Sequence, residues 1–284
     1  MDIIGFGKIG CGIARQLAEH PQYNVFYIDV GVTGRNCYAL PDSNTAEEAE
    51  EKTPNFSRLV KKVDKRLFFF CSGHEVPGGS ILATLEQFKN LKINVVYIRS
   101  DLDLLSEKER LQEKVTFNIL QQYARSALFE KIILVDDHRV ANILGNLSIV
   151  EYRQRINSFI AKSFHMVNYF KNSESVMSNI SPPREINRIC TIGIFCMETG
   201  KEKYFFDLDY LREKQFYFAF GEETLNKEKN LLNKISTQVK NAGQSEFTSV
   251  SYDITATTYE ENFTYVEAYT NFIQGEKIVD NSSE

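Results

Sequence analysis

The stretch DIIGFGKIGCGIARQLA (residues 2–18) decides the fold, because it places the glycine-rich turn GFGKIGCG (residues 5–12) between a hydrophobic strand and a helix. A second such turn, CSGHEVPGGS (residues 71–80), follows the strand at 67–70 and precedes a helix at 81–88. Backbone N–H groups at the start of a helix form a concave surface that favours phosphate. Two turns of this kind at the edge of one sheet predict a phosphate-bearing ligand.

Outward from these turns, strands and helices alternate along the first half of the chain. Strands are expected at 3–4, 25–28, 67–70, 95–98 and 132–135, with helices between them, and residues 45–52 form an exposed helix or an irregular tip. This order predicts a parallel sheet with helices on both faces.

The second half of the chain has a different pattern. Apolar residues at helical spacing from Ile149 to Phe170 predict one long helix, and Ser181-Pro182-Pro183 is typical of a linker. Strands at 189–196, 216–220, 248–257 and 263–273, with a helix at 225–239, predict a small mixed sheet. The expected fold class is therefore α/β, with an N-terminal parallel-sheet nucleotide-binding domain (1–145), a long central helix (146–171) and a small C-terminal α+β domain (172–284).

The composition excludes several classes of function. The 284 residues carry a net charge of -5, and basic residues are scattered among acidic ones, so neither nucleic acid nor a membrane surface is an expected partner. The five cysteines form no C-x-x-C pair and the four histidines do not cluster, which argues against a disulfide framework or a zinc site. With no apolar run long enough for a membrane span and Met1 close to the first strand, we expect a cytoplasmic protein without a signal peptide.

Taken alone, the first turn fits a dinucleotide-binding fingerprint. Gly5-x-Gly7-x-x-Gly10 is followed about twenty residues later by Asp29, an acid that could bind a ribose hydroxyl. A nicotinamide-dependent oxidoreductase is therefore one interpretation. Another is purely structural, because glycines also allow a helix to pack closely on a strand.

The order of elements resembles the tubulin/FtsZ superfamily over nearly the whole chain. The second glycine loop of that family usually reads G-G-G-T-G-[ST]-G, and the turn at 71–80 keeps Gly73, Gly78, Gly79 and Ser80 but not the central glycine-threonine pair. The segment from Phe218 to Ile273 is similar to the domain that follows the central helix in FtsZ. The short chain resembles plasmid or phage tubulin-like proteins more than the cell-division protein.

The resemblance implies GTP as the bound nucleotide, with Mg2+, and assigns roles to individual residues. Asp137 would accept hydrogen bonds from the guanine edge, or else Asp136 or Asp137 caps the next helix. Arg110 would contact the ribose and phosphates, or else it is a solvated helix residue. Glu151 and Tyr152 would contact the base. The residues expected around the phosphates are Gly7, Lys8, Gly10, Cys11, Gly73, Gly78, Gly79 and Ser80.

In this family, hydrolysis is completed across a subunit contact by an acidic loop after the central helix. The matching residues here are Asn172 and Glu174 in Asn172-Ser173-Glu174, where the family motif is N-x-D. The resemblance therefore implies a GTPase that assembles head to tail into filaments, with a DNA-binding adaptor or a host cytoskeletal protein as a further partner. A non-hydrolysing tubulin-like regulator or capping protein, or an interaction protein with an empty pocket, remain alternatives.

Overall fold

A parallel sheet forms the N-terminal half of the computed structural model, which describes residues 1–243, 248–259 and 261–275. Each neighbouring pair of strands in this half is parallel, as predicted. The short strand β3 is an addition to the five expected strands, and it lies at the outer edge. In spatial order the strands are β3 (Cys37–Leu40), β2 (Asn24–Val30), β1 (Asp2–Phe6), β4 (Arg66–Cys71), β5 (Lys92–Arg99) and β6 (Lys131–Asp136).

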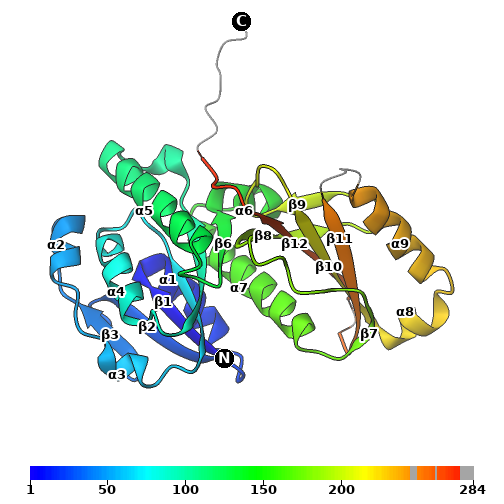
Figure 1. Ribbon diagram of the computed structural model, residues 1–284, viewed down its shortest axis with the longest axis horizontal. Helices are drawn as coiled ribbons and strands as arrows, with labels where there is room; N and C mark the ends of the chain where they lie inside the picture. The colour runs from blue at the N-terminus through cyan, green and yellow to red at the C-terminus, as the bar shows by residue number, and fades with distance from the viewer. Residues whose placement is uncertain (244–247, 260, 276–284) are drawn as a thin grey trace, which may run out of the picture.

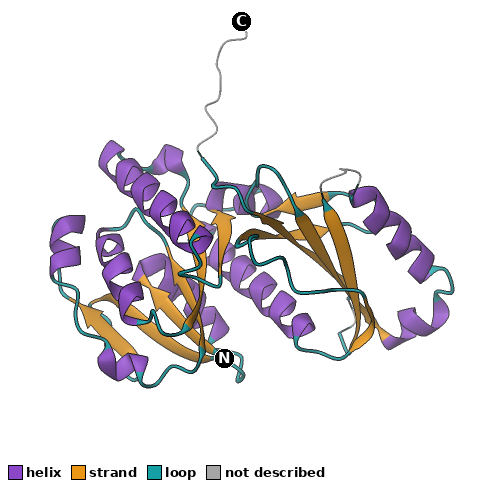
Figure 2. Cartoon of the chain, viewed as in Figure 1, coloured by secondary structure: helices purple, strands orange, loops and turns teal. Residues whose placement is uncertain are grey.

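Helices cover both faces of this sheet (Figures 1 and 2). Alternation along β4 divides the core, since Phe68 and Phe70 belong to one hydrophobic cluster and Leu67 and Phe69 to the other. The first cluster is shared with α1 (Gly7–Leu17), α6 (Asp137–Leu144) and α7 (Tyr152–Lys171). The second is shared with α3 (Ser57–Val60), α4 (Ile81–Gln87) and α5 (Glu107–Arg125), while α2 (Ala46–Glu51) lies against the second glycine turn.

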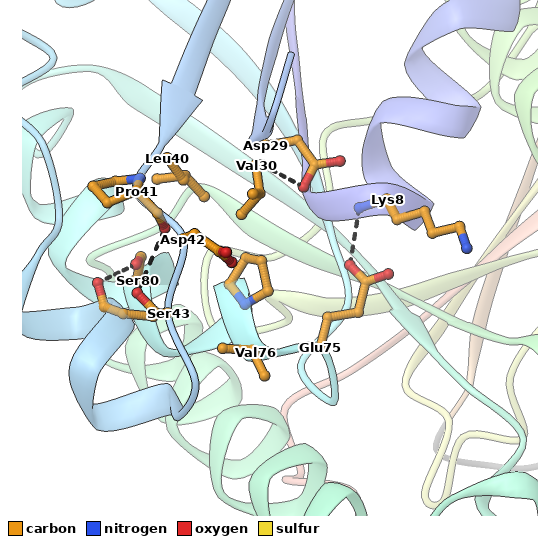
Figure 3. Close-up of a pocket in the computed structure, with 12 residues that line it drawn as sticks. Lys8, Asp29, Val30, Leu40, Pro41, Asp42, Ser43, Glu75, Val76 and Ser80 are labelled. Atoms are coloured by element: carbon orange, nitrogen blue, oxygen red, sulfur yellow. Dashed lines mark hydrogen bonds between the residues drawn. The ribbon is translucent and has the colours of Figure 1, made fainter.

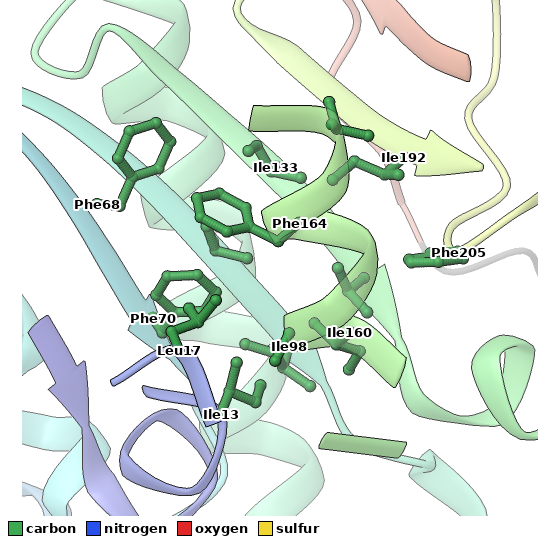
Figure 4. Packing of buried hydrophobic residues seen from close by; sticks show 14 of the residues in the cluster. Ile13, Leu17, Phe68, Phe70, Ile98, Ile133, Ile160, Phe164, Ile192 and Phe205 are labelled. Carbon is green, nitrogen blue, oxygen red and sulfur yellow. The ribbon is translucent and has the colours of Figure 1, made fainter. Parts of the chain in front are cut away.

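The central helix α7 begins at Tyr152 rather than near residue 146. Gly145 ends α6 with a φ of 80°, and Ile149 and Val150 lie in the following loop with 95% and 94% of their surfaces exposed. The hydrophobic spacing therefore predicted too early a start for the helix, because these two side chains are not part of the buried face of α7. From Ile156 onward the prediction is confirmed, and Phe164 packs edge-on against Phe68 and Phe70 (Figure 4). The division of the chain into domains at residues 145 and 171 stays a prediction.

The C-terminal half contains the expected mixed sheet. Strand β10 pairs in parallel with β11 and antiparallel with β12, and the helices α8 and α9 flank this sheet (Figure 1). The expected single helix at 225–239 is two helices, because the charged residues between them carry no apolar stripe while Leu231, Ile235 and Val239 do. The elements are β7 (Ser175–Ser178), β8 (Ile189–Phe195), β9 (Glu202–Tyr204), β10 (Glu213–Gly221), α8 (Glu222–Lys227), α9 (Leu231–Ala242), β11 (Ser249–Thr257) and β12 (Phe263–Thr270).

The two halves share one continuous sheet, because β8 pairs in parallel with β6. The proline segment that was expected to be a linker is fixed along β10, where the Glu213 carboxylate accepts hydrogen bonds from the Arg184 backbone N–H (3.0 Å) and from the Asn187 side chain. Among the described helices, none has both the length and the apolarity needed to cross a bilayer.

Candidate functional site

The first glycine turn forms the N-terminus of α1, directly after β1. Gly7 is the first helical residue, with a φ of 68°, and no side chain of the preceding residue caps the helix. A Cβ atom on Gly10 would lie 2.1 Å from the carbonyl oxygen of Phe70, so Gly10 lets α1 pack directly on β4. Cys11 is buried and its thiol donates to the Gly5 carbonyl oxygen at 3.1 Å, and burial raises its pKa to about 12. Close packing of α1 on β4 therefore explains why residue 10 is glycine. Gly7 and Lys8 are the first two residues of α1, directly after the end of β1.

The second glycine turn is held in place by α5. The Gln112 side-chain amide donates to the carbonyl oxygens of Gly73 and Glu75, at 2.7 and 2.5 Å. The Glu113 carboxylate accepts from the Gly73 backbone N–H (3.1 Å) and from the Tyr97 hydroxyl (2.7 Å). Burial raises the pKa of Glu113 to about 7. These contacts fix the backbone of the turn from beneath.

The second half of this turn, the 3-10 helix η1 (Val76–Ser80), packs against α2. A Cβ atom on Gly79 would lie 1.9 Å from the Ala46 carbonyl oxygen, and the Ser80 hydroxyl donates to the Ala49 carbonyl oxygen at 2.6 Å. Gly78 packs equally closely against its own turn, since a Cβ atom at this position would lie 2.5 Å from the Gly73 carbonyl oxygen. Close packing thus accounts for these glycines, and their contact with phosphate stays a prediction.

The two glycine turns meet at one cavity of about 310 Å³, which is also lined by the carboxyl ends of β2 and β3 and by the segment 41–43 that follows β3 (Figure 3). Lys8 contributes from the first turn and Glu75 from the second, and Asp29 lies at the end of β2. The Glu75 Oε2 atom accepts a hydrogen bond from the Lys8 backbone N–H at 2.9 Å. A Cβ atom on Gly7 would lie 2.4 Å from the same oxygen, so only glycine leaves room for this contact. A carboxylate therefore lies where a helix N-terminus binds anions.

The environment of Glu75 disfavours its charged form. Burial is the main cause, and the neighbouring charge of Asp29 adds to it, so the pKa of Glu75 rises to about 7. The Lys8 backbone hydrogen bond and the positive charges of Lys8 and Arg153 act in the opposite direction. The sequence showed that an acid, Glu75, stands inside a turn that was expected to bind phosphate. It did not show that Glu75 contacts Lys8, because this contact depends on how the two turns approach each other.

Asp137, at the start of α6, is fully buried, and its partner Arg153 also acts electrostatically on Glu75 in the cavity. Its Oδ2 atom pairs with the Arg153 guanidinium of α7 at 2.5 Å, whereas its Oδ1 atom has no hydrogen-bond partner in the part of the chain that the structure describes. Burial raises the pKa of Asp137 to about 6. Asp136, not Asp137, caps the helix, because its Oδ1 atom accepts from the Arg139 backbone N–H at 3.2 Å. Tyr152 lies close enough for the Asp137 charge to raise its pKa, after burial.

Two of the predicted residues are exposed to solvent. Arg110 is exposed on the first turns of α5, and its Nε atom donates to the Leu105 carbonyl oxygen at 3.1 Å. Glu151 is exposed and precedes α7 without capping it through its side chain. Arg99, at the end of β5, pairs with Asp136 instead (Nε to Oδ2, 3.0 Å) and covers the Phe206 ring. Arg99 and Arg153 were not among the site residues predicted from the sequence, although Arg99 directly follows the strand predicted at 95–98.

The residues expected to complete hydrolysis lie at the opposite end of α7. This helix of 20 residues spans about 30 Å, and Asn172 follows its last residue. The Asn172 side-chain amide donates to the Asn168 carbonyl oxygen at 2.7 Å. Glu174 is exposed between α7 and β7. These two residues are therefore remote from Asp137 and Tyr152 of the same chain.

Comparison with known proteins shows what this arrangement is similar to. No protein-family model and no curated protein sequence matches the chain. Among solved structures, the empty FtsZ dimer of M. jannaschii matches with a TM-score of 0.68 and 12% identity, over 95% of this chain and 87% of that one. A GTPγS-form protofilament of Bacillus thuringiensis serovar israelensis TubZ matches with a TM-score of 0.69 and 13% identity, over 96% and 87%. The GTPγS-bound protofilament of CetZ2 from Haloferax volcanii gives 0.67 and 12%, over 94% and 92%. The chain therefore has the fold of the tubulin/FtsZ superfamily.

Proposed function

We propose that this chain is a tubulin-like cytoskeletal protein that binds GTP at the cavity between its two glycine turns and assembles head to tail into filaments. One observation carries the nucleotide part of the proposal: the Lys8 backbone N–H, at the N-terminus of α1, already donates a hydrogen bond to an acidic group, the carboxyl of Glu75. A nucleotide phosphate is the ligand that such a helix end recognises best. Two of the similar structures contain GTPγS, according to their descriptions.

Guanine recognition is supported by the unused oxygen of Asp137. Guanine presents two neighbouring donors, N1–H and N2–H, on its Watson-Crick edge, and adenine does not present this pair. A carboxylate with one oxygen bound to Arg153, and the other without a partner among the described residues, has the acceptor that guanine requires. Tyr152, beside it, offers an aromatic ring for contact with the base.

Mg2+ fits this site as a companion of the phosphates. Magnesium is usually held by one or two carboxylates together with phosphate oxygens and water. Asp29 lines the cavity beside Lys8 and carries a raised pKa, chiefly because it is partly buried. The bound ion would neutralise phosphate charge, and Asp29 would be the residue that orients it.

Head-to-tail assembly is supported by exposed apolar pairs beyond both ends of α7. Ile149 and Val150 precede this helix and are almost fully exposed. Val176 and Met177 follow it on the edge strand β7 and are 59% and 44% exposed. A heterologous contact between two copies can cover both pairs at once, and it continues into a filament when its rotation does not close. The similar structures include protofilaments of TubZ and CetZ2.

Hydrolysis would be completed in such a contact by Asn172 and Glu174, which lie at the far end of α7 from the cavity and so could reach only the cavity of the next copy. Glu174 would orient the attacking water. The Glu75 contact favours a second candidate, a non-hydrolysing regulator or capping protein, since a carboxylate already fills the anion position. A nicotinamide-dependent oxidoreductase accounts for Asp29 but not for the C-terminal half.

The experiment that tests the proposal is sedimentation of the purified protein with GTP, GDP, ATP or no nucleotide, with released phosphate measured in the same tubes. Pelleting and phosphate release with GTP alone support a polymerising GTPase. Binding of GTP without either result supports the regulator. Absence of any response to GTP, together with binding of a nicotinamide dinucleotide, would contradict the proposal.

A further inference from the structure

We propose that Glu75 is a displaceable internal occupant of the phosphate position, so that only a ligand bringing a stronger anion than a single carboxylate can bind at the N-terminus of α1. This inference rests on the proposed GTP binding and identifies the residue that selects the ligand. Its basis is the hydrogen bond from the Lys8 backbone N–H to Glu75 Oε2, at 2.9 Å.

The contact is built into the backbone on both sides. On one side, Gly7 provides the space, because any side chain at that position would meet Glu75 Oε2 at 2.4 Å. On the other side, Gln112 of α5 holds the carbonyl oxygens of Gly73 and Glu75, so the turn presents the glutamate side chain toward α1 (Figure 3). Within the described parts of the chain, the Glu75 carboxylate accepts its hydrogen bond from the Lys8 N–H and none from its own turn, so it can leave without breaking the turn.

The Glu75 carboxylate is bound at the N-terminus of α1 less tightly than its hydrogen bond from the Lys8 N–H would suggest. The charged groups that face Glu75 are Lys8 of α1, Asp29 of β2 and Arg153 of α7, and His74 is its neighbour in the turn. Burial and the Asp29 charge raise the pKa of Glu75 to about 7, which means that its charged form is disfavoured in this position. Above that pH the ionised side chain gains free energy by moving into water. Displacement by an incoming phosphate therefore becomes easier as the pH rises from about 4.5 to about 7, and it changes little at higher pH.

The consequence for ligand selection follows from charge. A nucleoside without phosphate offers no anion to the Lys8 N–H and leaves Glu75 in place. A nucleoside di- or triphosphate brings several oxygens with greater negative charge and can replace the carboxylate. Because the base would bind near Asp137 and not near Lys8, removal of the Glu75 carboxylate should change the affinity for phosphates but not for the nucleoside.

The test is isothermal titration calorimetry of GTP, GDP and guanosine at pH 6, 7 and 8, with the wild type, Glu75→Ala and Glu75→Gln. We expect Glu75→Ala to bind GTP about tenfold or more tightly, as is usual when a competing charge-assisted hydrogen bond is removed. The affinity for guanosine should stay within twofold. The wild type should gain affinity for GTP between pH 6 and 8 relative to Glu75→Ala, whereas Glu75→Gln should lose this difference because it has no proton to titrate.

Glu50→Ala is the matched control, since Glu50 is an exposed acid of the neighbouring helix α2 that does not line the cavity. It should change GTP affinity by less than threefold. Equal GTP affinity in wild type and Glu75→Ala would overturn this inference and leave the proposed function intact, as would an equal gain in Glu50→Ala. Absence of GTP binding in the wild type and in both Glu75 variants, with unchanged circular dichroism, would overturn the proposed function and this inference with it.

Discussion

The Asp137 carboxylate and the Arg153 guanidinium form an ion pair in which the acid is completely buried and the arginine is 40% exposed. Only Oδ2 of Asp137 takes part, and Oδ1 has no partner among the described residues. The pair joins the start of α6 to the start of α7, and the Arg153 charge also acts on Glu75 of the second glycine turn. It therefore connects the candidate base site to the central helix.

Replacement of Asp137 by alanine should weaken GTP binding by about tenfold or more, and ATP binding less, because the acceptor for the two guanine donors is lost. Competitive binding of GTP and ATP to the wild type and Asp137→Ala measures this preference. Tyr152→Phe is a suitable control, since it keeps the ring and removes only the hydroxyl. If Asp137→Ala kept the full preference for GTP, the role of Asp137 would be limited to its ion pair.

The same pair should give the protein a pH-dependent stability. The pKa of Asp137 is raised from 3.8 to about 6, mainly by burial, so the folded state binds this proton more tightly than the unfolded state does. The free-energy cost of burying the charged Asp137 carboxylate is therefore absent below about pH 4 and fully present above about pH 6. Arg153→Met should destabilise the protein by about 1–3 kcal/mol at pH 7 and by less at pH 5. Urea unfolding at the two pH values tests this, and an equal loss at both would contradict it.

A buried charge cluster at the joint of the two halves should set the acid limit of the fold. The Glu267 carboxylate of β12 pairs with Lys171 of α7 and with Lys131 of β6 (3.5 Å), and also accepts from the Tyr269 hydroxyl (2.5 Å). Burial acts to raise the pKa of Glu267, but the two lysines and the hydrogen bonds outweigh it and lower the value to about 2. Its stabilisation, about 3 kcal/mol, is therefore present above pH 4.5 and is lost as the pH falls toward 2.

Glu267→Gln should accordingly lower the free energy of unfolding at pH 7 by about 3 kcal/mol or more, because two lysines would remain without their carboxylate. Thermal and urea unfolding measure the change. The exposed Glu185→Gln on the proline segment is the control and should have almost no effect. A Glu267→Gln protein as stable as the wild type would mean that the two lysines do not depend on the Glu267 carboxylate.

Two glycines of the first turn should respond differently to alanine. At Gly10 the new Cβ would meet the Phe70 carbonyl oxygen at 2.1 Å, so α1 must move off β4 and stability should fall by about 1–3 kcal/mol. At Gly12 it would meet only the Asn157 side-chain amide, at 2.5 Å, which can rotate away. Gly12→Ala should therefore stay within about 1 kcal/mol of the wild type, aided by the better helix propensity of alanine. Equal melting temperatures for the two variants would refute the packing role of Gly10.

Assembly should depend on the exposed loop before α7. Replacing both Ile149 and Val150 by serine should abolish GTP-dependent pelleting without changing the melting temperature, because neither side chain packs against the fold. Val115→Ser on the outer face of α5, where the valine is 48% exposed, is a matched control that should still assemble. Normal pelleting of the double variant would place the contact between copies elsewhere.

Turnover should depend on Glu174 across that contact. Glu174→Ala should bind GTP within twofold of the wild type but release phosphate at least tenfold more slowly, since a positioned acid that activates water contributes more than this. Glu174→Asp keeps the carboxylate and should retain part of the activity. If Glu174→Ala released phosphate at the wild-type rate in assembled samples, Glu174 would have no part in the reaction.

Much of the fold follows from local patterns in the sequence. The alternation through Leu67, Phe68, Phe69 and Phe70 predicts a strand buried on both faces, and the structure divides these residues between its two hydrophobic clusters. The central helix is predictable from Ile156 onward because its apolar residues recur at the helical period. Its start is not, since Ile149 and Val150 fit that period although no neighbouring element covers them.

The sequence by itself determined the strand-turn-helix units, because each depends on residues only a few positions apart, and their alternation predicted the parallel order. The need for glycine at positions 10 and 79 was decided by tertiary structure, since the atoms that approach them belong to Phe70 and Ala46. The partners of the site depended on tertiary structure. Glu75 reaches the Lys8 N–H across 67 residues, and Asp137 meets Arg153 only because α6 turns back at Gly145 into α7. The sequence does not show which group a charged side chain will contact, because its position is fixed only when the backbone has packed. The ligand that satisfies a helix N-terminus, a neighbouring carboxylate or a phosphate, is therefore decided by tertiary structure alone.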